Sequence, residues 1–283
     1  MAKPNVAATQ VVKYTNHTPT LHHDLLAVEE PMEIRLGFGA LDMREQKSIA
    51  VTMRTPGNDF ELAVGFLLSE GIIQGYEQLL KVQYCTDLNT KENTENIVRV
   101  ELKPNVGVDL SKLQRNFYAT SSCGICGKES IESVKLNCAL QTNPTPIHLD
   151  SSLITQLPNT LRNSQTIFEH TGGIHACALF TSNGDLLLLR EDVGRHNALD
   201  KLIGAALYQT EIALHESILL LSGRASFELI QKAAMAGIPI VCAVGAPSSL
   251  AVETATAFNI TLIGFLREHR FNVYHQSSNV SIN

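Results

Sequence analysis

The alternation of apolar and polar positions predicts a small α+β unit over residues 23–118. Residues 33–39 (EIRLGFG) and 47–54 (KSIAVTMR) have the pattern of strands, and residues 82–87 and 96–102 add two more. The segment FELAVGFLLSEG between the second and third strands has the apolar spacing of a helix.

Capping signals frame that helix. Asn58 is the predicted N-cap, with Glu61 three residues later as its capping-box partner, and Gly71 is the predicted C′ residue. Before the unit, residues 1–22 are polar and show no periodicity, so we expect a flexible arm. A short tail at 277–283 ends the chain.

From residue 119 to about 276 the pattern becomes one of alternating strands and helices. Two strands flank Asn183-Gly184, a pair typical of a type I′ hairpin turn. Near-continuously apolar strands separated by helices indicate a parallel sheet that is covered on both faces, so we expect a three-layer α/β/α domain. After the hairpin we expect helices at 195–208, 225–236 and 247–258, and strands at 217–222, 238–244 and 260–266.

The composition limits the cellular compartment and the classes of partner that we expect for this α/β protein. The longest apolar runs are strand-length, far below the roughly 20 residues of a membrane helix. The N-terminus lacks the apolar region of a secretory signal, so we expect a cytoplasmic protein whose six cysteines stay reduced. The net charge of −6 argues against general nucleic-acid binding.

Polar residues collect where the predicted strands end, which is where α/β sheets bind ligands. Arg224 follows one strand in the sequence SGRAS, and small residues, GAPSS, follow the next. A helix N-terminus after such a loop favours an anion. The densest group is REDVGRHNALDK at 190–201, and the last strand ends in FLREHR, which comprises Phe265, Leu266, Arg267, Glu268, His269 and Arg270.

These arginines admit two interpretations. A guanidinium binds phosphate oxygens and stacks on bases, which predicts a phosphate-bearing or nucleotide ligand. Alternatively, the arginines only solvate a rim or pair with the acids nearby, namely Glu191, Asp192 and Glu268.

The sequence TGGIHACA at 171–178 has a similar ambiguity. Its Gly-Gly turn needs no ligand, and His175 beside apolar residues is typical of a hydrogen-bonded core group. Four cysteines in apolar contexts are expected to act as small hydrophobic residues: Cys85, Cys138, Cys177 and Cys242.

The loop SSCGICG puts Cys123 and Cys126 three positions apart among glycines and serines. A structural zinc site is one interpretation, with Cys138 and His148 completing an irregularly spaced set of four ligands. A thioredoxin-like dithiol is a second, although no thioredoxin βαβ pattern precedes the loop. A persulfide carrier is the third, because a thiolate at a helix N-terminus can take up a donor's outer sulfur.

The order of these segments resembles one family. SSCGICG, TGGIHACA, REDVGRHNALDK, SGRASFELIQKA, GAPSSLAVETA and GFLREHRFNVY follow one another as in FdhD proteins, the formate dehydrogenase accessory sulfurtransferases, and the resemblance runs from about residue 30 to 275. The resemblance implies a sulfur carrier that takes sulfur from a cysteine desulfurase. It implies delivery of that sulfur to a molybdenum cofactor, Mo-bis(molybdopterin guanine dinucleotide). The formate dehydrogenase catalytic subunit needs the sulfurated cofactor to become active.

The resemblance also assigns roles to residues. It makes Cys123 the persulfide cysteine and Cys126 the second loop cysteine, a candidate relay, and it makes residues 265–270 the cofactor-binding segment. Arg224 is added to that segment from its own place at a strand end before a helix. It implies a homodimer, a cytidine-deaminase-like larger domain and no permanent protein metal. The deaminase zinc signature is absent, since no HxE is followed by PCxxC, so we expect nucleotide binding without deamination.

Overall fold

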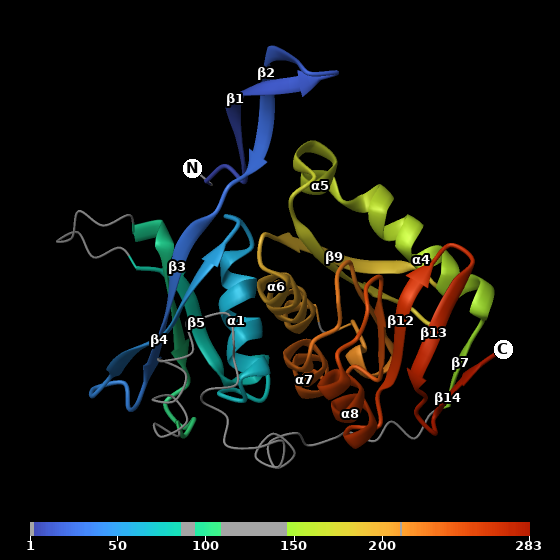
Figure 1. Cartoon of the computed structure of the whole chain (residues 1–283). Helices are drawn as coiled ribbons and strands as arrows, with labels where there is room; N and C mark the ends of the chain where they lie inside the picture. The colour runs from blue at the N-terminus through green and yellow to red at the C-terminus, as the bar shows by residue number, and fades with distance from the viewer. Residues whose placement is uncertain (1–2, 86–93, 109–145, 210) are drawn as a thin grey trace.

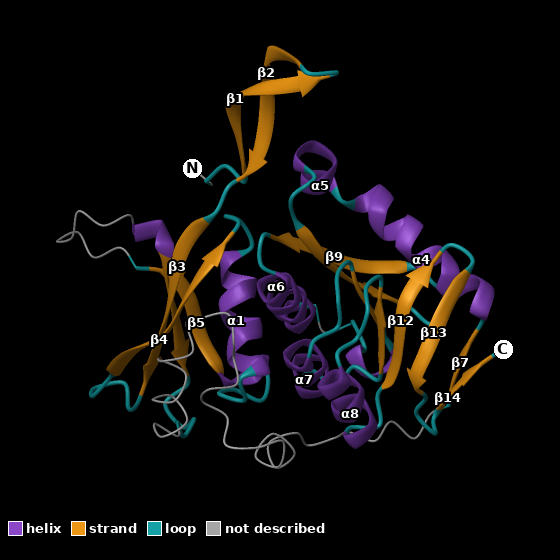
Figure 2. Ribbon diagram, in the orientation of Figure 1, coloured by secondary structure: helices purple, strands orange, loops and turns teal. Residues whose placement is uncertain are grey.

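The computed structural model describes residues 3–85, 94–108, 146–209 and 211–283. Two β-sheets stand on either side of a layer of helices (Figures 1 and 2). The described part therefore has the mixed α/β class that the sequence predicts. The boundary expected at residues 118–119 lies outside the described residues.

The smaller sheet has the strand order β4-β3-β6-β5. Its strands are β3 (Glu30–Phe38), β4 (Glu45–Arg54), β5 (Leu79–Tyr84) and β6 (Ile97–Leu102), with the short 3-10 helices η1 (Tyr76–Gln78) and η2 (Thr94–Asn96) before β5 and β6. The alternating side chains of β3 and β6 that face helix α1 (Asp59–Ser69) are buried, which is why the period-two pattern locates both strands.

The structure confirms the predicted ends of α1 but not its predicted capping box. Asn58 is the N-cap, yet its backbone is left-handed with φ 58° and its side chain makes no capping hydrogen bond. Glu61 does not complete a capping box, because its carboxylate binds Arg190 at 2.5 and 2.8 Å. Gly71 takes the C′ position with φ 69°.

The larger sheet has the order β13-β12-β11-β10-β8-β9. Its three central strands β10, β11 and β12 are parallel, whereas β8, β9 and β13 pair antiparallel to their neighbours. The strands are β8 (His175–Phe180), β9 (Leu186–Asp192), β10 (Ile218–Leu221), β11 (Ile240–Ala243), β12 (Thr261–Arg267) and β13 (Arg270–His275). The 3-10 helix η3 (Leu214–Glu216) precedes β10.

Helices cover both faces of this sheet. One face packs on α6 (Arg195–Tyr208), α7 (Phe227–Met235) and α8 (Ser249–Ala257), in a core that continues through α1 to the smaller sheet. The other face packs on α4 (Ser151–Ser164), which is followed by α5 (Thr166–Thr171). Strand β8 divides its side chains between the two cores, since Leu179 faces one and Phe180 the other.

The N-terminal segment differs from the expected arm. Residues 6–27 form an antiparallel hairpin of β1 (Val6–Thr15) and β2 (Thr18–Ala27), which projects from the rest of the molecule (Figure 1). Asn16 and His17 both have positive φ, 51° and 65°, as a two-residue type I′ turn requires. The prediction of no regular structure here is wrong.

The second hairpin and the tail also differ in detail. Strands β8 and β9 form the predicted hairpin, but only Gly184 of the Asn183-Gly184 pair has a positive φ, so the turn is not type I′. The expected tail contains β14 (Val280–Ile282), which pairs in parallel with β7 (Ile147–Leu149). Among the described residues, no helix is long and apolar enough to span a membrane.

Candidate functional site

Backbone hydrogen bonds tie together the loops that follow the parallel strands. Gly245 N donates to Gly223 O at 2.8 Å, Ser248 N to Ala225 O at 3.0 Å, and Phe265 N to Gly245 O at 3.0 Å. Gly245 has no room for a side chain, because a Cβ there would lie 2.9 Å from Gly223 O. The loops SGRAS and GAPSS and the end of β12 therefore form one surface, as the sequence predicts for the carboxyl edge of the sheet.

The segment FLREHR forms the bend between β12 and β13. Phe265 has φ 52° at a bulge and is exposed, whereas Leu266 is fully buried in the core. Arg267 pairs in register with Arg270 across the hairpin, and both side chains are exposed. Glu268 and His269 make the turn between them, which places five of the six segment residues at the surface of this edge.

The strand-end arginines are of two kinds. Arg190 is bound by Glu61, so its role is structural. Arg224, Arg267 and Arg270 make no ion pair with any described residue; Arg267 donates only to the carbonyls of Val244 and Leu266. Pairing with an acid therefore accounts for Arg190 alone, and the other three guanidinium groups are exposed donors, either solvated at the rim or available to an anion.

Two of the three acids expected to neutralise those arginines, Glu191 and Asp192, have other partners. Glu191 accepts hydrogen bonds from the backbone N–H groups of Ile167 and Phe168, both at 2.9 Å, and so anchors α5 beside β9. Asp192 lies 2.7 Å from Lys201 Nζ in a fully buried pair. Most of the REDVGRHNALDK segment thus joins β9 and α6 to the smaller sheet rather than lining the edge.

A pocket of about 500 Å³ opens at the same edge of the larger sheet. Its lining includes Ser222 and Val244 from the strand ends, His175 from the start of β8, and Gln165 and Arg162 from the junction of α4 and α5. Gln165 is only 5% exposed, and its Nε2 has no hydrogen-bond partner in the described structure. A buried amide donor without a partner is costly, so this atom indicates a ligand or water in the pocket.

His175 is partly a core residue and partly a residue of the candidate site. It is half-buried and lines the pocket, and a Cβ at Gly223 would lie 3.4 Å from its Nδ1. Burial lowers the pKa of His175, and the nearby charge of Arg195 lowers it further. Neutral imidazole therefore faces the pocket as one donor and one acceptor.

The two loop cysteines, Cys123 and Cys126, lie outside the described residues, as does Cys138. Two of the other cysteines behave as the sequence predicts. Burial raises the pKa of the Cys177 thiol, and it raises that of Cys242 to about 12. Neither is a nucleophile near neutral pH. His148 of the zinc interpretation is on β7, where its Nδ1 is 2.6 Å from Ser281 Oγ.

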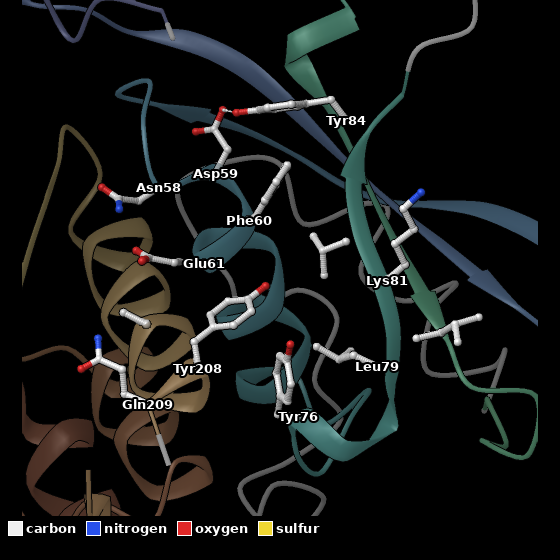
Figure 3. Close-up of a pocket in the computed structure, with 13 residues that line it drawn as sticks. Asn58, Asp59, Phe60, Glu61, Tyr76, Leu79, Lys81, Tyr84, Tyr208 and Gln209 are labelled. Atoms are coloured by element: carbon white, nitrogen blue, oxygen red, sulfur yellow. Dashed lines mark hydrogen bonds between the residues drawn. The ribbon is translucent and has the colours of Figure 1, made fainter. Parts of the chain in front are cut away.

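A second pocket of about 500 Å³ lies between α1, β5 and the end of α6 (Figure 3). Phe60, Tyr76, Tyr84 and Tyr208 contribute aromatic rings, and Tyr84 Oη is 3.2 Å from Asp59 Oδ2. Burial, and then the charge of Asp59, raise the pKa of Tyr84 to about 12. Glu61, which binds Arg190, also lines this pocket, and the sequence analysis does not foresee it.

The sequence analysis also misses Gln165 and Arg162. No element is predicted between residues 146 and 174, because Pro158 within α4 is a helix-breaking signal and α5 has only six residues. Arg162 lies over the ring of Phe168, 4.0 Å from its centroid, which fixes the junction that carries Gln165. The Asp150 N-cap, which accepts from Ser152 N at 2.7 Å, is the signal that could have located α4.

Comparisons with known proteins agree with the resemblance. A sulfur carrier protein FdhD from Streptomyces coelicolor is 46% identical over 275 residues, which cover 96% of this chain and 95% of that protein. The protein of the same name from Mycobacterium tuberculosis is 47% identical over 262 residues, covering 91% and 92%.

A solved structure shares the fold. The crystal structure of a candidate formate dehydrogenase accessory protein from Desulfotalea psychrophila has a TM-score of 0.72 at 23% identity, and the match covers 98% of this chain and all of that one. The FdhD/NarQ family model matches residues 27–281. With that span and such identities, the chain belongs to the FdhD/NarQ family.

Proposed function

We propose that the protein is a sulfur carrier that serves formate dehydrogenase. It takes persulfide sulfur from a cysteine desulfurase onto Cys123 and passes it to the bis(molybdopterin guanine dinucleotide) molybdenum cofactor as substrate. The relatives named sulfur carrier protein FdhD support the general role. The cytosol, where thiols stay reduced, is the compartment that suits this chemistry.

The observation that carries the ligand assignment is the carboxyl edge of the larger sheet. Three exposed arginines that form no ion pair with the described residues, Arg224, Arg267 and Arg270, share this edge with the pocket lined by Gln165, whose Nε2 has no hydrogen-bond partner there. A ligand with pyrophosphate groups and purine bases suits this set, because guanidinium binds the phosphates and amides read base edges. We infer further that the larger domain is deaminase-like and binds the nucleotide without the zinc chemistry of a deaminase.

The transfer step needs a thiolate. Cys123 attacks the outer sulfur of the donor persulfide, the donor S–S bond breaks, and the donor cysteine leaves as its thiolate. As a relay, the Cys126 thiolate attacks the outer sulfur and Cys123 leaves as its thiolate. As a resolving residue, the Cys126 thiolate attacks the inner sulfur of the Cys123 persulfide, a Cys123–Cys126 disulfide forms, and the outer sulfur leaves at the sulfide level for the cofactor. Cys177 and Cys242 are unsuited to this role, since burial raises the pKa of both thiols.

Mass spectrometry after incubation with a cysteine desulfurase and cysteine tests the carrier role. We expect an adduct of one sulfur atom on the wild type and on Cys85→Ala, a matched control at a half-buried cysteine. Cys123→Ala should show no adduct. An adduct that survives in Cys123→Ala would overturn the assignment.

The alternative is a zinc-stabilised nucleotide-binding module without sulfur transfer. One tightly bound zinc per chain, lost together with the fold in Cys126→Ser, would favour it.

Nucleotide binding is measured separately by calorimetry with guanosine diphosphate. Arg270→Ala should weaken binding about tenfold or more and leave persulfide loading intact, because a charge-assisted contact is lost. Arg35→Ala, remote from the site on β3, should bind as the wild type does. Equal affinity of Arg270→Ala and wild type would refute the phosphate contact.

A further inference from the structure

We propose that the first turns of helices α6 and α7 form a phosphate-binding subsite in which the guanidinium of Arg195 supplies the positive charge. The subsite is separate from the FLREHR segment, because Arg195 follows β9 whereas that segment ends β12, and three strands lie between them in the sheet. That the phosphate belongs to a nucleotide rests on the proposed function. The phosphate contact itself does not.

Arg195 is a cation without a partner. It is the first residue of α6 and is partly buried. Its guanidinium forms no ion pair or hydrogen bond with any described residue, and its Nε is shut off from solvent without an acceptor. A buried cationic donor in this state is costly, and a bound anion would remove the cost.

The acids nearest to Arg195 in the chain and in the fold have other partners. Asp192 Oδ2 lies 2.7 Å from Lys201 Nζ in a fully buried pair. Glu228 Oε2, in the first turn of α7, lies 2.7 Å from His196 Nε2, a close contact although not a well-aligned hydrogen bond. The charge of Arg195 is therefore left for a ligand.

The two helix N-termini lack side-chain caps. The N-cap of α6 is Gly194, and the N-cap of α7 is Ser226, whose Oγ is buried without a hydrogen-bond partner in the described structure. The backbone N–H groups of the first three residues of α6 have no acceptor among the described residues either.

These uncapped ends lie next to each other. Helices α6 and α7 run side by side (Figure 1), and the contact of His196 with Glu228 joins their first turns. Donors from both helices therefore converge beside Arg195, as phosphate sites at helix N-termini require.

The subsite adjoins the pocket at the carboxyl edge. Val193, which directly precedes the α6 N-cap, lines that pocket, and so does Ser222 in the loop that leads to α7. His175 lines it too, and Arg195 is close enough to lower the pKa of His175. Gln165 is 5% exposed, and its Nε2 has no hydrogen-bond partner among the described residues. A phosphate at Arg195 thus leaves the rest of its ligand to a pocket that also has a donor to satisfy.

Phosphate suits this set better than a carboxylate does. Its oxygens can reach the guanidinium, the backbone N–H groups and the Ser226 hydroxyl at the same time, whereas a carboxylate has two oxygens in one plane. A guanine nucleotide would place its diphosphate at Arg195 and its base in the pocket.

NMR of the arginine Nε–H signals tests the contact in the full chain, with inorganic pyrophosphate and guanosine diphosphate as probes. We expect the Arg195 signal, assigned by its absence in Arg195→Gln, to shift and saturate with either probe and to stay unmoved by guanosine. A shift with pyrophosphate alone would assign the subsite to a free diphosphate, and a shift with guanosine diphosphate alone to a nucleotide. No shift with either would overturn the proposal.

Calorimetry with pyrophosphate measures what each donor contributes. Arg195→Gln should weaken binding at least about tenfold, because a charge-assisted contact is lost. Ser226→Ala should weaken it several-fold without lowering thermal stability, since its Oγ has no partner within the described structure.

Lys81→Gln is the matched control. It also removes one positive charge, from an exposed residue of β5 that makes no ion pair with the described residues, and it should bind pyrophosphate within about twofold of the wild type. Equal affinities of Arg195→Gln and Lys81→Gln would overturn the subsite.

Persulfide loading, followed by mass spectrometry, separates this proposal from the sulfur-carrier role. Arg195→Gln should load sulfur as the wild type does. A wild type that binds pyrophosphate at Arg195 but takes up no sulfur would remove the carrier role and keep the subsite. A wild type that loads sulfur while its Arg195 signal never moves would remove the subsite alone.

Discussion

At the scale of single residues, His175 shows how one side chain is tuned by its surroundings. Burial is the largest influence and lowers the pKa of His175, and electrostatic interaction with Arg195 and His196 lowers it further, whereas Asp192 raises it. The folded protein therefore binds a proton on His175 less readily than the unfolded chain does. Stability from this group is fully present above pH 6.5 and declines as the pH falls toward the lowered pKa.

NMR titration of the His175 ring checks this. We expect its inflection below pH 6.5 in the wild type, and we expect Arg195→Gln to move it upward, because the variant removes a nearby positive charge. A wild-type inflection at or above 6.5 would contradict the lowered pKa.

At the scale of elements, helices α1 and α6 cross at two glycines. A Cβ at Gly65 would lie 1.8 Å from Asp200 O, and a Cβ at Gly204 would lie 1.9 Å from Glu61 O. Both neighbours are backbone atoms, so neither helix can yield without moving as a whole. The crossing brings Glu61 within reach of Arg190 and Ser69 within reach of Asp200.

Denaturant unfolding of glycine variants tests the crossing. Gly65→Ala and Gly204→Ala should each lower the free energy of unfolding by about 3 kcal/mol or more, because overpacking against backbone cannot relax locally. Gly107→Ala, where a Cβ would meet nothing within 4 Å, is the control and should change it by less than about 0.5 kcal/mol. Similar stabilities for all three variants would show that the helices separate more easily than the distances imply.

The elements differ in how well the sequence predicts them. Helix α6 begins and ends at the predicted residues 195 and 208, because its apolar spacing is regular and a glycine precedes it. The β1–β2 hairpin is missed because Gln10 and His23 interrupt its apolar face while Val11 and Leu26 add apolar residues to the other. Strands β7 and β14 have three residues each and pair across more than a hundred positions, which local patterns do not encode.

At the scale of the whole molecule, local sequence patterns predict one part of the candidate site but not the part that depends on contacts between distant segments. The rule that ligands bind at the carboxyl ends of parallel strands places Arg224 and residues 265–270 on one edge, as the structure has them. Gln165 could not be predicted, because it reaches the edge through the anchoring of α5 by Glu191, a contact between distant segments.

Buried charges also join the two units that the sequence separates. Lys232 Nζ of α7 lies 2.9 Å from both carboxylate oxygens of Asp200 on α6 and 2.8 Å from Ser69 Oγ on α1. Lys201 Nζ of α6 donates to Thr55 O beside the smaller sheet at 2.8 Å. With one apolar core running through the same region, loss of either unit would expose charges and apolar surface in the other. We therefore expect the described units to unfold together.

Hydrogen exchange measured by mass spectrometry tests this coupling. Lys232→Met leaves Asp200 buried without its cation, so it should lower the free energy of unfolding by about 3–5 kcal/mol, and by the same amount for peptides from α1 and from α7. Lys81→Met is the matched control, because Lys81 is exposed on β5 and makes no ion pair with the described residues; its effect should stay below about 0.5 kcal/mol. Loss of protection confined to α7 would mean that the two units unfold separately, and that the buried pair stabilises its own helices without joining them to the smaller sheet.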